Sequence, residues 1–257
     1  MQIGISSASL YPQLPTETAV VNIAAMGCRL SEIFLQTRRE YSYSYCRKLS
    51  RLCRCLGVQV HSLHAASSQY EPMLFYRYKR QNLDGWDILR EVLEAAAVLG
   101  AQCLVFHGSL KIDNPPQSRL LAVLQSVAEI AADWGIQLAL ENVSWCTGWS
   151  PGVFRWLSDQ QVPNLYYTFD SKQAVRSGFA AEEYITAMAG RLVNVHISDG
   201  GGGIPETGMD FSGLAKCLNA SGYSGPIILE AYGKKVESAG LLAQGWRTVQ
   251  KGFHKVI

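Results

Sequence analysis

The stretch from Asn164 to His196, NLYYTFDSKQAVRSGFAAEEYITAMAGRLVNVH, contains the unit from which the fold can be inferred. It opens with an apolar and aromatic run that ends at Asp170, passes through a helical pattern near 181–189, and returns to an apolar run after Gly190. A glycine there is typical of a helix end, because glycine adopts the left-handed backbone that follows a helix at the least cost. The stretch therefore predicts a strand, a helix and a second strand, with an acidic residue and a histidine at the two strand ends.

The same unit recurs along the whole chain. Six helical patterns end in a glycine that an apolar run follows, and a seventh ends at Pro163 instead; the glycines are Gly27, Gly57, Gly100, Gly135, Gly190 and Gly222. Seven connectors predict eight strands, near 2–6, 30–35, 58–63, 102–107, 136–141, 164–169, 191–196 and 226–230. Helical patterns alternate with them near 16–26, 41–56, 81–99, 117–133, 151–159, 181–189, 211–221 and 237–254.

This alternation predicts an α/β fold, a single (β/α)8 TIM barrel that occupies residues 1–257 as one domain. Continuous apolar runs are typical of strands buried on both faces of a parallel sheet. Eight strand–helix units in about 250 residues match the length of such a barrel. A doubly wound sheet is the competing fold, but no GxGxxG motif follows the first strand.

The composition excludes several classes of protein. The 257 residues are 48% hydrophobic and 17% charged, and 23 basic against 21 acidic side chains leave a net charge of +2. This balance argues against disorder and lacks the basic stripe with which proteins bind nucleic-acid phosphates. No apolar run approaches the ~20 residues that span a bilayer, and we see no secretory leader. We therefore expect a cytoplasmic protein that binds neither nucleic acid nor membrane.

Ionisable residues stand at six successive strand ends. The third to eighth predicted strands end at His64, His107, Glu141, Asp170, His196 and Glu230. In barrels of this kind the chemistry lies at the C-terminal ends of the strands. Three carboxylates that converge with an imidazole on the barrel axis would repel one another without a cation. We therefore predict that a divalent metal binds there.

The sequence resembles the xylose-isomerase-like barrels, which include sugar isomerases, ketose epimerases, related dehydratases and the endonuclease IV nucleases. The resemblance rests on these segments: Leu140-Glu141-Asn142, Phe169-Asp170, Val195-His196-Ile197-Ser198-Asp199, Ile228-Leu229-Glu230, the segment GCRLSEIF that begins at Gly27, and the run PETGMDFSGLAKCLNASGYSGPIILE from Pro205 to Glu230. It extends over the whole chain.

The resemblance implies that Glu141, Asp170, His196 and Glu230 bind one divalent ion, for which Mn²⁺, Mg²⁺, Co²⁺ and Zn²⁺ are all suitable. It also implies that Glu141 and Glu230 act as acid and base. A metal on the carbonyl and hydroxyl oxygens of a hydroxy-ketone acidifies the C–H between them. One glutamate then removes that proton to give an enediolate, and proton return produces isomerisation or epimerisation of a sugar, sugar acid, cyclitol or sugar phosphate.

Two departures from the family keep other functions open. Ketose 3-epimerases usually have a histidine three residues after the aspartate and an arginine six residues after the metal histidine, where this chain has Gln173 and Gly202. The trinuclear nucleases need that same histidine and an Asp-x-His motif, whereas Asp210 is followed by Phe211 and Ser212. The alternatives are an endonuclease IV-like phosphodiesterase that acts on abasic DNA, against which the missing ligands and the net charge of +2 count, and a non-catalytic sugar-binding barrel.

Residues around the predicted metal are candidates for substrate binding. We expect His64 and His107 to form hydrogen bonds with a substrate rather than to bind a second metal, and Trp145 to pack on the apolar face of a sugar. Gln173 and Asp199 complete the candidate set. The aromatic connection near 65–80 is expected to form a lid or pocket wall, and the cations Lys172, Arg176, Lys234 and Lys235 to be solvated. The expected partner is a small sugar, and a homo-oligomer is allowed.

Overall fold

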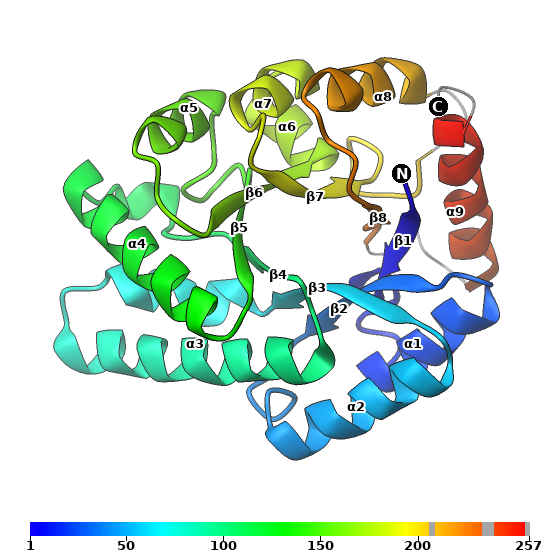
Figure 1. The fold of residues 1–257 in the computed structure, drawn as a ribbon, viewed down its shortest axis with the longest axis horizontal. Helices are drawn as coiled ribbons and strands as arrows, with labels where there is room; N and C mark the ends of the chain where they lie inside the picture. The colour runs from blue at the N-terminus through cyan, green and yellow to red at the C-terminus, as the bar shows by residue number, and fades with distance from the viewer. Residues whose placement is uncertain (206–208, 233–238, 255–257) are drawn as a thin grey trace.

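Eight parallel strands close into a barrel in the computed structural model, which describes residues 1–205, 209–232 and 239–254 (Figure 1). The strands are β1 (Ile3–Ser6), β2 (Leu30–Leu35), β3 (Gln59–Ala65), β4 (Cys103–Phe106), β5 (Gln137–Glu141), β6 (Leu165–Asp170), β7 (Leu192–Ile197) and β8 (Ile227–Leu229). Each strand pairs with the next in the chain, and β8 pairs with β1. The predicted (β/α)8 TIM barrel is confirmed, and every strand boundary lies within two residues of its predicted place.

Helices surround the barrel on its outside (Figure 1). They are α1 (Thr16–Ala25), α2 (Tyr43–Cys55), α3 (Lys79–Leu99), α4 (Gln117–Asp133), α5 (Pro151–Asp159), α6 (Ser171–Ser177), α7 (Ala181–Ala187), α8 (Phe211–Ala220) and α9 (Ala239–His254). None of the helices in the described part of the chain is long and apolar enough to cross a membrane.

The short helix α6 has no counterpart among the predicted helices. It begins directly after β6, and the Asp170 carboxylate caps it by accepting a hydrogen bond of 2.8 Å from the Gln173 backbone N–H. Seven residues give too few turns for an apolar periodicity to be recognised in the sequence. This helix matters for the site because it starts at one of the predicted metal ligands and carries Lys172 and Gln173.

Tight packing closes the barrel between its first and last elements. A Cβ atom added to Gly4 of β1 would lie 2.8 Å from the Ile228 side chain and 2.9 Å from the Leu30 carbonyl oxygen, so only glycine fits there. The helix α9 lies beside β1 (Figure 1), and the Trp246 indole N–H donates a hydrogen bond of 3.0 Å to the Ile3 carbonyl. The C-terminal helix is thereby attached to the first strand.

The connection between β3 and α3 is not the aromatic lid that the sequence suggests. It contains two 3₁₀ helices, Ser67–Gln69 and Glu71–Phe75, and the rings of Tyr70 and Phe75 are buried. The Asn82 side chain of α3 donates hydrogen bonds to carbonyls of the second 3₁₀ helix. The connection does form a pocket wall, since its residues 65–69, Glu71 and Pro72 line a cavity of about 190 Å³, but the rings of Tyr70 and Phe75 take no part because they lie in the core.

Candidate functional site

The carboxyl ends of β5 to β8 bring four ionisable side chains together. Glu141 ends β5, Asp170 ends β6, His196 lies in β7 and Glu230 follows β8. Each has at least one ligand atom within 4.8 Å of those of the other three, and all four side chains are buried. This cluster is called the tetrad below.

The His196 imidazole lies between the two glutamates of the tetrad. Its Nδ1 atom is 3.4 Å from Glu141 Oε1 and 3.4 Å from Glu230 Oε2. The opposite nitrogen, Nε2, donates to Glu32 Oε2 at 2.8 Å, and Glu32 also accepts hydrogen bonds from Ser62 (2.7 Å) and Ser6 (3.0 Å). Burial alone would lower the pKa of His196, but Glu32 and Glu230 raise it well above its usual value. Because a carboxylate can only accept, Glu32 keeps the proton on Nε2 and leaves the Nδ1 lone pair to the tetrad whenever the ring is neutral.

The second oxygen of Glu141 contacts a pair of histidines. Glu141 Oε2 lies 2.8 Å from His107 Nε2, which in turn lies 3.0 Å from His64 Nε2. Burial alone would raise the pKa of Glu141, but the hydrogen bonds with His107 and His196 hold it well below its usual range. Burial and the neighbouring His107 lower the pKa of His64. His107 Nε2 faces both Glu141 and His64, so its one proton forms a full hydrogen bond with only one of them at a time. His64, His107 and Glu141 also have the donor atoms and proximity of a three-residue metal group.

The second oxygen of Glu230 also accepts a hydrogen bond from a side chain that can donate a proton, the Tyr232 hydroxyl. Glu230 Oε1 accepts a hydrogen bond of 2.6 Å from the Tyr232 hydroxyl and lies 3.7 Å from His64 Nδ1. Its other oxygen, Oε2, lies 3.5 Å from the Lys172 ammonium. Burial raises the pKa of Glu230, but the positive charges of His196 and Lys172 lower it by more, so that the net pKa lies below its usual value. Glu230 is therefore a carboxylate in the folded protein.

Asp170 divides its two oxygens between the fold and the tetrad. Oδ1 caps α6, whereas Oδ2 is buried without a hydrogen bond and lies 3.3 Å from the Lys172 ammonium. Burial raises the pKa of Asp170 to about 6, against the lowering effect of Lys172. The Asn142 side chain holds this strand end in place by accepting from the Asp170 N–H (2.6 Å) and donating to its carbonyl (3.0 Å).

The donor atoms of the tetrad suit a divalent metal ion. Asp170 Oδ2 and His196 Nδ1 are buried polar atoms without a hydrogen-bond partner in the described residues. Their nearest partners are the longer ion-pair contacts with Lys172 (3.3 Å) and with the two glutamates (3.4 Å), so a coordinated metal would satisfy both atoms better than these contacts do. Three carboxylate oxygens and one imidazole nitrogen are ligands for Mn²⁺, Mg²⁺, Co²⁺ or Zn²⁺.

A cavity of about 190 Å³ is connected to the tetrad through two of its lining residues, His107, which contacts Glu141, and His64, which lies near Glu230. His64 and His107 line it together with Phe34 and Trp145, and 48% of the Trp145 side chain is exposed. The Phe34 ring stacks on His64, with ring centroids 5.2 Å apart. Three of the five candidate substrate residues, His64, His107 and Trp145, thus face one cavity, which has aromatic walls and imidazole donors.

The other two candidate residues form hydrogen bonds with backbone and side-chain groups of the loops around the site. Gln173 Oε1 accepts from the Ser144 N–H (3.2 Å) and hydroxyl (3.1 Å), which joins α6 to the segment after β5. Asp199 Oδ1 accepts from the backbone N–H groups of Gly201 and Gly203 and closes the glycine-rich turn. Asp210, the residue at which a nuclease motif would begin, caps α8 through the Gly213 N–H.

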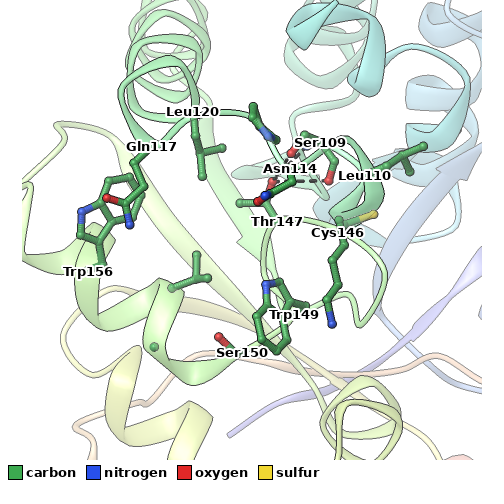
Figure 2. Close-up of a pocket in the computed structure, with 14 residues that line it drawn as sticks. Ser109, Leu110, Asn114, Gln117, Leu120, Cys146, Thr147, Trp149, Ser150 and Trp156 are labelled. Carbon is green, nitrogen blue, oxygen red and sulfur yellow. Dashed lines mark hydrogen bonds between the residues drawn. The ribbon is translucent and has the colours of Figure 1, made fainter.

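A larger cavity of about 500 Å³ lies outside the tetrad, between the loops that follow β4 and β5 (Figure 2). In Figure 2, Trp156 and Gln117 lie on one side of it, and Ser109, Thr147 and Cys146 on the other. The Lys111 ammonium stands 3.7 Å from the centroid of the Trp149 ring. Leu110 and Cys146, which form an isolated antiparallel bridge, line both this cavity and the one beside the tetrad.

Sequence reasoning missed three side chains around the tetrad, Glu32, Glu71 and Tyr232, and misplaced a fourth, Lys172. Glu32 interrupts the apolar strand LSEIFL, so the argument applied to Glu141 could have found it. Lys172 is buried, which contradicts its expected place on a solvated helix surface, whereas Arg176 is exposed as expected. Nothing in the sequence separates these two cations, because their difference arises from the short helix α6. Lys234 and Lys235 lie outside the described residues.

Comparison with known protein families identifies the one to which this chain belongs. The model of the family described as xylose isomerase-like TIM barrel matches residues 20–251. The chain belongs to this family. The match covers nine-tenths of the chain and confirms the resemblance to the xylose-isomerase-like barrels that the sequence suggests.

Individual relatives of this xylose isomerase-like barrel are distant. An uncharacterised protein of Methanocaldococcus jannaschii, MJ1311, is 25% identical over 249 residues, which cover 90% of this chain and 83% of the relative. An L-ribulose 3-epimerase of Methylomonas sp. strain DH-1 is 28% identical over 166 residues, or 59% of this chain and 57% of the epimerase. A solved structure of an L-ribulose 3-epimerase superposes with a TM-score of 0.83 at 20% identity, and covers 100% of this chain and 96% of that one. The structural likeness confirms the fold.

Proposed function

We propose that this xylose isomerase-like barrel is a divalent-metal-dependent isomerase or epimerase of a small sugar or sugar derivative. Support comes from the family, from the sugar epimerases among its relatives and from the tetrad. The alternatives are a phosphodiesterase that acts on abasic DNA and a non-catalytic sugar-binding barrel. The observation that carries the proposal is the arrangement of Glu141 and Glu230.

Each of these two glutamates directs one oxygen to the centre of the tetrad and the other to a side chain that carries a proton. Glu141 has Oε1 near His196 and Oε2 on His107. Glu230 has Oε2 near His196 and Oε1 on the Tyr232 hydroxyl. Because β5 and β8 are separated by β6 and β7, the two carboxylates reach the centre from different sides. A pair of bases placed in this way suits the removal and return of a proton at one carbon.

A metal held by Glu141, Asp170, His196 and Glu230 would supply Lewis-acid polarisation of a carbonyl and its neighbouring hydroxyl, which acidifies the C–H between them. The chain's own residues then divide the proton transfer. One glutamate takes the proton from carbon, and His107 or Tyr232 forms a hydrogen bond with its second oxygen. For epimerisation, the other glutamate takes up a proton from the donor on its own second oxygen, His107 or Tyr232, and delivers it to the opposite face of the same carbon; return of the abstracted proton to the neighbouring carbon gives isomerisation.

The cavity beside the tetrad favours a small polar substrate. Its volume of about 190 Å³ and its lining of His64, His107 and Trp145 suit a single sugar ring or open-chain sugar better than a polymer. A flat indole packs on the C–H face of a sugar, and imidazole nitrogens form hydrogen bonds with hydroxyl groups. We propose His64, His107 and Trp145 as substrate-binding residues, and Gln173 and Asp199 as residues that position the loops around the substrate.

Solvent exchange tests this function without knowledge of the substrate. The protein is incubated in D₂O with Mn²⁺ and, one at a time, with ketoses, aldoses, inososes and their phosphates, and NMR records loss of the carbon-bound proton. We expect deuterium at one carbon of at least one compound, and at least 1000-fold slower exchange for Glu141→Gln and Glu230→Gln. A panel without exchange, or exchange that persists in both variants, would contradict the proposal. Metal-dependent cleavage of abasic DNA would favour the nuclease instead.

A further inference from the structure

Lys172 places a buried cation against the tetrad. The residue stands in the first turn of α6 and is only 3% exposed. Its ammonium lies 3.3 Å from Asp170 Oδ2 and 3.5 Å from Glu230 Oε2. No other lysine or arginine in the described residues forms an ion pair with a carboxylate of the tetrad. A charged amine is rarely buried in this way unless it neutralises nearby negative charge.

The two oxygens that Lys172 contacts are ones that a bound metal would use. Asp170 Oδ2 has no hydrogen bond, and Glu230 Oε2 is the oxygen that faces His196 Nδ1. A coordinated divalent ion lies about 2.0–2.2 Å from a carboxylate oxygen. An ion at that distance from both oxygens would stand close to the ammonium, and two positive charges in a buried space repel strongly. The ammonium, 3.3 Å and 3.5 Å from these oxygens, therefore opposes the binding of a second positive charge to them and lowers the affinity of the site for a metal.

We propose that Lys172 takes the place of the metal's charge in the metal-free protein and competes with the ion for Asp170 and Glu230. This inference rests on the proposed metal-dependent function. It deepens that function by assigning to Lys172 the control of metal affinity, and it implies that the ammonium moves aside when an ion binds.

The surroundings of Lys172 provide a place for the displaced ammonium. The ammonium already lies 4.4 Å from the centroid of the Tyr232 ring, whose face attracts a cation. The aliphatic part of the side chain passes over Gly202, where an added Cβ would lie 3.1 Å from Lys172 Cδ. The Tyr232 ring thus offers the ammonium a second partner beside the two carboxylates.

A fixed structural ion pair would have the opposite effect on metal binding. If Lys172 only held Asp170 and Glu230 in the geometry that a metal needs, its removal would weaken the metal complex. If it competes with the metal, its removal leaves carboxylates without a counter-charge, which destabilises the metal-free protein and strengthens metal binding. The direction of the change in affinity thus separates the two roles.

The test compares Lys172→Met with wild type and with Arg176→Met, which removes the same charge from an exposed position of the same helix. Titration calorimetry at one pH and ionic strength measures the Mn²⁺ dissociation constant of metal-free protein, and thermal unfolding measures its Tm. We expect about tenfold tighter binding and a lower metal-free Tm for Lys172→Met, and wild-type values for Arg176→Met. Unchanged or weaker binding by Lys172→Met would overturn the inference and leave the proposed function standing.

A second measurement applies if metal-free Lys172→Met does not fold. The variant is then purified with Mn²⁺ bound, and the rate of metal loss to excess chelator is compared with that of loaded wild type. Release that is about tenfold slower supports competition, and equal or faster release contradicts it. If neither wild type nor variant binds a divalent ion, both this inference and the metal-dependent function fail. If only the variant binds one, the inference holds and the function of the wild type fails.

Discussion

A buried carboxylate that touches no substrate can still set the affinity of a metal centre, and Glu32 is placed to do so. It accepts the Nε2 proton of His196 at 2.8 Å and is itself held by Ser6 and Ser62. We predict that Glu32→Gln weakens metal binding about 10–100-fold, the range found when such carboxylate partners of metal-bound histidines are removed. Calorimetric titration with Mn²⁺ at pH 8 measures the change.

The matched control for that variant is Glu91→Gln, which removes a carboxylate that pairs with Arg38 on the surface. Its Mn²⁺ affinity should equal that of wild type. An unchanged affinity in Glu32→Gln itself, with the fold intact, would show that the orientation and charge of His196 do not depend on Glu32.

The raised pKa of Glu71 leads to a prediction of how the stability of the folded protein depends on pH. Burial raises the pKa of Glu71 to about 7, although its Oε2 accepts hydrogen bonds from the His107 (2.6 Å) and Gly108 (2.8 Å) N–H groups. The folded protein therefore holds this proton more tightly than the unfolded chain, whose glutamate has a pKa near 4.5. The contribution of Glu71 to stability is present below pH 4.5 and is lost as the pH rises to about 7.

Comparison of wild type with Glu71→Gln isolates this contribution. The free energy of unfolding of metal-free protein is measured by urea titration at several pH values. We expect the free energy of unfolding of wild type, minus that of Glu71→Gln, to fall as the pH rises from 4.5 to 7 and to level off above pH 7. The total fall should be about 1.4 kcal/mol for each unit by which folding raises the pKa of Glu71. A difference that is constant over this range would refute the raised pKa.

Among the elements, the segment between β5 and α5 positions Glu141, and Gly148 permits its path. An added Cβ at Gly148 would lie 2.2 Å from the Glu141 carbonyl oxygen and 2.9 Å from the Phe154 ring. Because backbone at the end of β5 would have to move, we predict that Gly148→Ala destabilises the protein by about 1–3 kcal/mol and weakens metal binding. Urea unfolding and Mn²⁺ titration measure the two effects.

The control for this change is Gly152→Ala in α5, where the nearest atom to an added Cβ is Ser150 Oγ at 3.7 Å. Alanine there should leave stability unchanged or raise it slightly, since glycine is the poorer helix former. If both variants behave alike, the close approach of Gly148 to Glu141 does not constrain the site.

Elements with a clear periodicity could be predicted from the sequence, and elements defined by tertiary contacts could not. The strands ending at Glu141 and Asp170 are recognisable as apolar runs closed by a carboxylate. The helix α6 and the 3₁₀ helix Glu71–Phe75 are too short for a pattern and form through side-chain caps and packing on α3. The same limit explains why Glu71 was missed and why Lys172 was expected to be solvated, since the burial of both follows from these short elements.

At the scale of the whole molecule, the tetrad joins the ends of four neighbouring strands, β5 to β8, in a closed barrel. An ion that binds only the folded state should therefore stabilise the entire barrel. With Mn²⁺ at 100 times its dissociation constant, the expected gain is about 2.7 kcal/mol, which corresponds to a Tm increase of about 5–10 °C for a chain of this size. Differential scanning calorimetry with and without Mn²⁺ measures it.

Addition of excess chelator should reverse the increase in Tm, and Glu230→Gln should show little increase at the same Mn²⁺ concentration. A Tm that does not respond to divalent ions in wild type would mean that no metal bridges these strands.

The metal content of the protein tests the central claim most directly. Elemental mass spectrometry is applied to wild type purified without chelator and to Glu230→Gln prepared in the same way. We expect about one divalent ion per wild-type chain and clearly less in the variant, because the tetrad loses one of its four ligands. Two or three ions per chain would contradict a mononuclear centre and favour the nuclease, and no ion even after incubation with Mn²⁺ or Zn²⁺ would contradict metal-dependent catalysis.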